Sequence, residues 1–155
     1  MKIRPVLLVE DDDNDVLFLR TAWKKASVPN SLAVVTDGEK ALDYLAGAGQ
    51  YLDREAHPYP CLLLLDLNLP RKTGFEVLRW ILDHSEHKTL PVVVLTSSSA
   101  ESDAVRAYQL GANSYVIKPS NPDRLLDFIN LIKSYWLGWN FAPPAHSPGG
   151  TLTET

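Results

Sequence analysis

The chain has 155 residues, of which 45% are hydrophobic and 22% are charged, proportions that are ordinary for one globular domain. A formal net charge of −4 provides no basic face for nucleic acid, and no apolar stretch is long enough to span a membrane. Cys61 is the only cysteine, which excludes an intrachain disulfide and a cysteine-based zinc site. We therefore expect a cytoplasmic protein with neither nucleic acid nor membrane as a partner.

The first predicted element is a short buried strand at Val6–Val9, which runs directly into an acidic segment at residues 10–15. Apolar residues at helical spacing follow this segment and predict a helix. Carboxylates near a helix N-terminus are favourable caps, but one or two would serve that purpose. Five acids in six residues exceed this need, so we expect a second role for some of them.

A second strand is predicted at Leu32–Thr36, with Asp37 capping the next helix, and residues 47–60 form a loop. The third apolar run, Leu62–Leu65, leads directly into Asp66. A short continuous apolar run is typical of a strand that is buried on both faces of a parallel sheet. The carboxylate that follows it is either a helix cap or a binding group, because burial without a partner is costly.

Two further strands are predicted at Val92–Leu95 and Tyr115–Ile117, and polar residues follow both. Thr96 ends the fourth strand, and Lys118 follows the fifth. Five strands that alternate with five helices predict an α/β fold with a doubly wound parallel sheet. The carboxyl ends of the strands converge on one crevice in such a sheet. The polar residues expected there are Glu10, Asp11, Asp66, Thr96 and Lys118.

The final predicted helix, which begins at Asn121 and Pro122, carries more apolar surface than one contact uses. Its surplus apolar residues and the aromatic segment after it include Leu126, Leu131, Tyr135, Trp136 and Trp139. Because apolar patches tend to mark interfaces, we expect a homodimer through this helix and the C-terminal segment. The alternative is that the aromatic residues fold back onto their own domain.

The acidic crevice has a charge problem that a divalent cation would solve. Two like charges about 4 Å apart cost roughly 4 kcal/mol at an effective dielectric constant near 20. Carboxylates, a backbone carbonyl and water suit Mg²⁺, and we expect Asp11 and Asp66 as ligands. Glu10 would bind directly or through water, and the Asn68 carbonyl would complete the set. An oriented carboxylate beside a metal, a hydroxyl and a lysine fits phosphoryl transfer to Asp66.

The chain resembles the receiver domain of bacterial response regulators. The matching segments are VEDD at 9–12, LLLLDLNLPRKTG at 62–74, VVVLTSS at 92–98 and YVIKP at 115–119. The resemblance covers about residues 3–135 and implies a flavodoxin-like (βα)5 fold with strand order 2-1-3-4-5. We expect a receiver domain at 1–137, and the composition of 138–155 predicts an aromatic, then Pro/Gly-rich, partly disordered tail.

The resemblance implies that a sensor histidine kinase transfers a phosphoryl group from a phosphohistidine to Asp66. The implied Mg²⁺ ligands are Glu10, Asp11, Asp66 and the backbone carbonyl of Asn68. The implied phosphoryl-binding residues are Thr96, Ser97 and Lys118. Thr96 and Tyr115 would form a conformational switch, and the bond that precedes Pro119 would be cis. Such a protein is not an enzyme in the usual sense, since it catalyses only its own phosphorylation and dephosphorylation.

Only a short segment follows the receiver region, so we expect no DNA-binding output domain. A single-domain regulator and a phosphorelay carrier both fit this organisation. The long loop at 47–60 and the aromatic end are similar to regulators that serve phytochrome kinases. A rival hypothesis is a phosphohydrolase of the haloacid-dehalogenase type, but Asn68 replaces the second Asp of its D-x-D motif. A receiver-like scaffold without phosphorylation would have lost Asp66, Thr96 or Lys118, and all three are present.

Overall fold

The structure is a computed structural model that describes residues 3–144. Strands and helices alternate along the chain. The strands are β1 (Val6–Val9), β2 (Leu32–Val35), β3 (Leu62–Leu65), β4 (Val92–Thr96) and β5 (Ser114–Ile117). The α-helices are α1 (Asp13–Lys25), α2 (Gly38–Ala46), α3 (Gly74–Asp83), α4 (Glu101–Gln109) and α5 (Pro122–Leu131). Two 3-10 turns, η1 (Gly49–Tyr51) and η2 (Ser85–His87), and the π-helical segment η3 (Ile132–Trp139) complete the described part.

The five strands form one parallel sheet in the order β2-β1-β3-β4-β5, which confirms the predicted fold and strand order. Every residue of the three inner strands β1, β3 and β4 is buried, as their continuous apolar runs require. The edge strand β5 is only partly buried. Because all neighbouring strands are parallel, the five carboxyl ends lie along one edge of the sheet.

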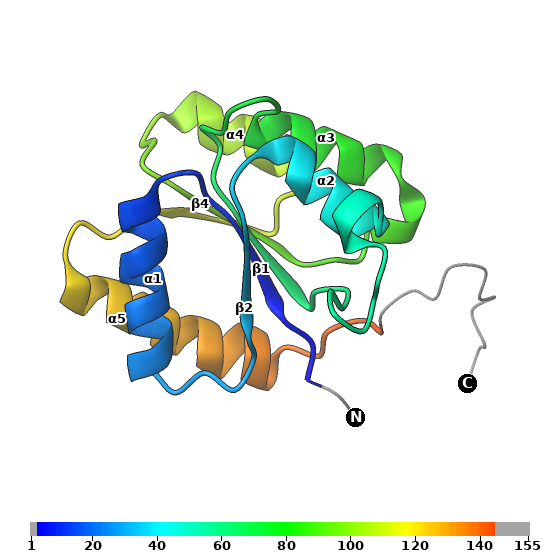
Figure 1. Cartoon of the computed structure of the whole chain (residues 1–155). Helices are drawn as coiled ribbons and strands as arrows, with labels where there is room; N and C mark the ends of the chain where they lie inside the picture. The colour runs from blue at the N-terminus through cyan, green and yellow to red at the C-terminus, as the bar shows by residue number, and fades with distance from the viewer. Residues whose placement is uncertain (1–2, 145–155) are drawn as a thin grey trace.

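Helices cover both faces of the sheet: α1 and α5 lie on one face, and α2, α3 and α4 lie on the other (Figure 1). Alternate strand residues supply the two cores. Leu7 and Leu63 belong to the core under α2 and α3, whereas Leu8 and Leu64 belong to the core under α1 and α5. This alternation is the two-residue period of a strand, and it fixes the sheet between its two helical layers.

Polar caps begin most helices at the carboxyl edge of the sheet. The side chains of Asp12, Asp37 and Asn121 each accept a hydrogen bond from a backbone N–H in the first turn of the following helix. The Asp37 cap confirms its sequence prediction. Thr73 and Glu76 form a reciprocal capping box at the start of α3. These caps hold the loops that carry the polar residues of this edge.

The C-terminal helix is longer than the sequence pattern suggests. Helix α5 continues without a break into η3, which ends at Trp139 and therefore includes the first two positions of the expected tail. Arg4 donates a hydrogen bond to the Pro143 carbonyl at 2.8 Å, which places residues 140–144, directly after η3, beside the start of the chain (Figure 1). Residues 145–155 of the expected tail lie outside the described residues. Among residues 3–144, no helix is long and apolar enough to cross a membrane.

Candidate functional site

The carboxyl ends of β1, β3 and β5 bring three predicted site residues into direct contact. Lys118 Nζ lies 2.6 Å from Glu10 Oε2 and 3.0 Å from Asp66 Oδ2. A third carboxylate, from Asp15 in the first turn of α1, lies 2.9 Å from the same ammonium. One lysine is therefore surrounded by three carboxylates.

The sheet itself fixes the backbone of these residues. The Asp66 N–H donates to the Val9 carbonyl at 3.1 Å, and the Lys118 N–H donates to the Thr96 carbonyl at 2.8 Å. Glu10 makes the same kind of hydrogen bond to β2. Each residue thus continues the hydrogen bonding of its strand by one step, so its side chain leaves the sheet at a defined point.

The carboxylate of Asp66 is oriented through both of its oxygens. The Asn68 N–H donates to Oδ1 at 3.3 Å, while Lys118 binds Oδ2. Asp66 and Glu10 are buried, whereas Asp11 is exposed. These side chains open into a cavity of about 460 Å³, which is lined by Glu10, Asp11, Asp12, Asp13, Asn14, Asp15, Asp66, Asn68, Ser97 and Lys118.

The residues fit a divalent cation. One carboxylate oxygen from each of Glu10, Asp11 and Asp66 lies within 4.8 Å of the other two. These three acids and Asp15 carry four negative charges when ionised, whereas Lys118 supplies one positive charge. Hard carboxylate oxygens around an open cavity suit Mg²⁺ and similar ions, which keep several waters when bound.

Burial and charge shift two pKa values in the site. Burial raises the pKa of Glu10 from 4.5 to about 7; the hydrogen bond from Lys118 opposes this shift, and the charge of Asp66 adds to it. Burial lowers the pKa of Lys118, but its hydrogen bonds to Glu10, Asp15 and Asp66 outweigh this effect and raise the pKa above its ordinary value. Lys118 is therefore a permanent cation at neutral pH.

The two predicted switch residues lie next to the cavity rather than in its lining. Thr96 is fully buried at the end of β4, and its hydroxyl accepts a hydrogen bond from the Ser98 N–H at 3.3 Å. The Tyr115 hydroxyl donates to the Ser98 carbonyl at 3.0 Å. Thr96 and Tyr115 are thus linked through one residue of the loop that follows β4.

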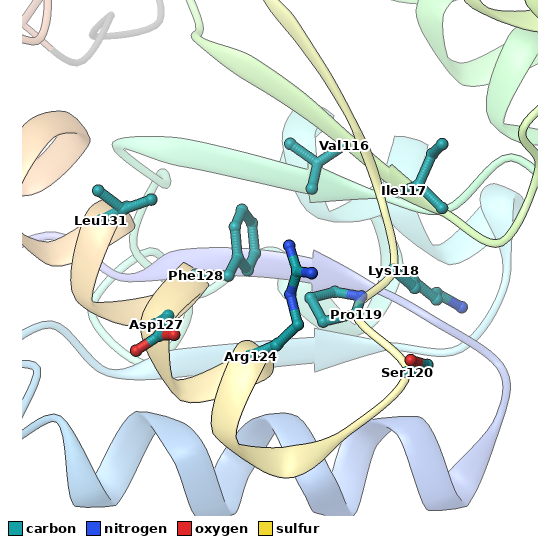
Figure 2. A pocket seen from close by; sticks show the side chains of 9 residues that line it. All are labelled: Val116, Ile117, Lys118, Pro119, Ser120, Arg124, Asp127, Phe128 and Leu131. Atoms are coloured by element: carbon teal, nitrogen blue, oxygen red, sulfur yellow. The ribbon is translucent and has the colours of Figure 1, made fainter.

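The predicted cis bond before Pro119 is wrong for this structure, because all peptide bonds between described residues are trans. An X-Pro bond favours trans by about 0.5–1 kcal/mol unless its surroundings select the cis form. Pro119 borders an open cavity of about 430 Å³ between β5 and α5 (Figure 2), so packing does not force the cis form. Lys118 also lines this cavity, and its ammonium reaches Glu10 and Asp66 at the acidic edge.

The predicted interface residues fall into two groups. Leu131, Tyr135 and Trp139 are exposed on α5 and η3. Leu126 and Trp136 are half-buried and pack against the core under α1 and α5. The first group alone forms an exposed apolar surface, which we call the α5 patch.

Asp15 is a site residue that sequence reasoning missed. The sequence pattern shows that the acidic run exceeds capping needs, but it predicts a site role only for Glu10 and Asp11. Asp12 caps α1 by accepting from the Asp15 N–H at 3.0 Å, so the cap does not involve the Asp15 carboxylate. The position of Asp15 in the first turn of a helix that begins at the site is the sequence feature that could have identified it.

Comparison with known proteins gives a consistent result. The family described as response regulator receiver domain matches residues 6–130. Response regulator Rcp1 of Synechocystis is 39% identical over 132 residues, which cover 85% of this chain and 88% of Rcp1. The Mn²⁺-bound structure of Rcp1 matches with a TM-score of 0.81 and 38% identity, covering 91% of this chain and 99% of that chain.

Two further solved structures are similar over nearly their whole length. The phosphorylated cyanobacterial phytochrome response regulator RcpA has a TM-score of 0.84 and 36% identity, covering 92% of this chain and 100% of that chain. Response regulator RPA3017, from red light signalling in R. palustris, has a TM-score of 0.88 and 34% identity over the same shares of the two chains. This family match also favours a receiver over the haloacid-dehalogenase hypothesis.

Proposed function

The chain belongs to the response regulator receiver domain family, and we propose that Asp66 accepts a phosphoryl group from a phosphohistidine of a sensor histidine kinase. The observation that carries this proposal is the buried Asp66 carboxylate, held by Lys118 at 3.0 Å in an open acidic cavity. A buried carboxylate in a water-accessible cavity, with a fixed cation beside it, is equipped to act as a nucleophile toward phosphorus.

The proposed step exchanges one bond to phosphorus for another. An oxygen of Asp66 attacks the phosphorus atom, the P–N bond of the phosphohistidine breaks, and the imidazole nitrogen leaves with the electron pair. The Asn68 N–H orients the attacking carboxylate, and Lys118 neutralises charge on the transferring oxygens. Positioning and electrostatics therefore account for most of the catalysis.

We propose Mg²⁺ as the cation of the acidic site. Glu10, Asp11 and Asp66 would hold it through carboxylate oxygens, and Asn68 through its backbone carbonyl. When bound, the ion would stabilise negative charge on the transferring phosphoryl oxygens. The Mn²⁺-bound structure of the relative Rcp1 supports a divalent cation in this family.

The proposed output is a change of surface near β5. Thr96 and Ser97 would contact the phosphoryl group, and Tyr115, linked to Thr96 through Ser98, would change position with it. Phosphorylation can shift such an equilibrium only by stabilising one form more than the other. The similarity to RcpA and RPA3017 supports a phytochrome kinase as the donor, and a phosphorelay carrier would use the same chemistry.

We also propose that the chain forms a homodimer through the α5 patch. Leu131, Tyr135 and Trp139 follow one another at intervals of four residues and are all exposed. Exposed large apolar side chains that form one continuous surface are typical of protein interfaces. Phosphorylation would act on this surface because α5 follows the Lys118 loop directly.

The test of the phosphoacceptor is the intact mass after incubation with acetyl phosphate, with and without Mg²⁺. We expect the wild type to gain one phosphoryl group only when Mg²⁺ is present. Asp66→Asn should gain none, whereas Asp43→Asn, a matched change at an exposed aspartate of α2, should behave as the wild type. An equal gain in Asp66→Asn would contradict the proposal.

A further inference from the structure

The ammonium group of Lys118 has no spare hydrogen-bond donor. It carries three N–H groups, and three different carboxylates lie within bonding distance of it. The distances are 2.6 Å to Glu10 Oε2, 2.9 Å to Asp15 Oδ2 and 3.0 Å to Asp66 Oδ2. A phosphoryl oxygen on Asp66 can therefore bind Lys118 only by displacing one of these acceptors.

The three carboxylates differ in what displacement would cost. The side chains of Glu10 and Asp66 are 3% and 6% exposed, so water cannot replace their contact with Lys118. Asp66 also keeps one carboxyl oxygen as an acceptor for Lys118 when the other oxygen carries the phosphoryl group. The Asp15 side chain is 42% exposed and can be hydrated when it leaves. Helix α1 does not need this carboxylate as a cap either, because Asp12 accepts the capping hydrogen bond.

We propose that Asp15 is an exchangeable counterion of Lys118. It occupies the third N–H of the ammonium in the unphosphorylated chain and yields it to a phosphoryl oxygen on Asp66. This inference rests on the proposed function of Asp66. Asp15 acts only through Lys118, so it is a positioning residue, and its contact favours the unphosphorylated form.

The exchange predicts the direction of a measurable effect. Binding of fluoroberyllate, a phosphoryl analogue, would require the wild type to break the Asp15–Lys118 ion pair. Asp15→Asn has no such ion pair to break, so it should bind the analogue more tightly. Partly exposed ion pairs are weak, and we expect a gain of about two- to fivefold in affinity.

The experiment is calorimetric titration of fluoroberyllate into the full chain at saturating Mg²⁺, so that differences in metal affinity do not enter. Asp13→Asn is the matched control, since it removes the same charge from the same turn of α1. Among the described residues, Asp13 forms no ion pair with Lys118. We expect Asp15→Asn to bind more tightly than both the wild type and Asp13→Asn.

Two outcomes would overturn the exchange: equal affinities for Asp15→Asn and Asp13→Asn, or weaker binding by Asp15→Asn. A crystal structure of the Mg²⁺–fluoroberyllate form supplies a second readout that does not depend on affinity. Asp15 should lie beyond about 4 Å from Lys118 Nζ in that form, and an intact ion pair there would also contradict the proposal. Failure of the proposed function looks different, because the wild type and Asp66→Asn would then bind the analogue equally or not at all.

Discussion

Glu10 links the charge of the acidic edge to pH. It is buried, its pKa is raised to about 7 chiefly by burial, and Lys118 is its nearest cation. Because the folded chain binds this proton more tightly than the unfolded chain, the contribution of Glu10 to stability falls as the pH rises from 4.5 to about 7. A metal that binds the ionised carboxylate must displace the same proton.

Mg²⁺ binding should therefore release protons near neutral pH. With a pKa of about 7, Glu10 is half protonated at pH 7, and each bound ion should release about half a proton. The apparent affinity should rise roughly tenfold between pH 6 and pH 8. Calorimetry in two buffers of different ionisation enthalpy measures the released protons directly.

Glu10→Gln serves as the control because glutamine is similar in size and does not titrate in this range. It should bind Mg²⁺ more weakly and release no proton at pH 7. If the wild type releases none either, then Glu10 is not the group that couples the metal to pH.

Several site residues could be located from sequence because strands position them. Asp66 and Lys118 each follow a short apolar run, and parallel topology brings such positions to one edge. Asp15 could not be selected this way, because its contact depends on the direction of one side chain in a helical turn. The conformation before Pro119 is likewise set by local packing, which a sequence pattern does not contain.

The strands and most helices were predictable because buried positions require apolar residues, and their spacing in the sequence differs between strands and helices. The leucine run of β3 is buried on both faces, and α1 to α4 have polar caps or helical periodicity in the sequence. The end of the last helix was less clear, since Gly138 weakens helical propensity. Tertiary contacts outweigh this weakness: Ile132 is buried and Trp136 is half-buried in the core beneath α1.

The loop between β3 and α3 connects helix packing to the site. Gly74, the first residue of α3, donates its N–H to the Leu67 carbonyl at 2.9 Å. A Cβ at this position would overlap the Asp66 carbonyl oxygen and would lie 2.7 Å from Leu67 Cα. Both obstacles are backbone atoms, which cannot move aside as a flexible side chain can.

Gly74→Ala should therefore affect both stability and the site. Overpacking of this kind costs about 1–3 kcal/mol, measured as the free energy of unfolding in urea. Because the displaced backbone belongs to Asp66, phosphorylation by acetyl phosphate should also slow under conditions in which the variant remains folded. Gly138→Ala is the matched control, since its Cβ would approach only the Lys133 carbonyl, at 3.3 Å. Equal unfolding free energies for the two variants would contradict the predicted overlap.

The molecule has two distinct candidate functional surfaces, the acidic cavity and the α5 patch. The acidic cavity lies at the carboxyl edge of the sheet, and the α5 patch lies along the helix that starts just after Lys118. Helix α5 packs on α1, which also carries Asp15. A change at Lys118 thus has a short structural path to the patch, as the proposed switching of a dimer surface requires.

The proposed dimer predicts a localised effect of charge on association. Leu131 is 64% exposed in the α5 patch, and Leu131→Glu would place a carboxylate in the apolar centre of the interface. We expect the dimer to dissociate roughly tenfold more readily, a loss of about 1.4 kcal/mol. Sedimentation equilibrium at tens of micromolar, with and without fluoroberyllate and Mg²⁺, measures this change.

Leu52→Glu provides the comparison, because Leu52 is an equally large side chain, is 75% exposed and lies beside η1, outside the patch. It should associate as the wild type does, since a carboxylate there remains hydrated in both monomer and dimer. If both variants dissociate alike, the effect is one of net charge rather than of the α5 patch. A wild type that remains monomeric in every condition would remove the dimer, and the exposed Trp139 would then need another partner.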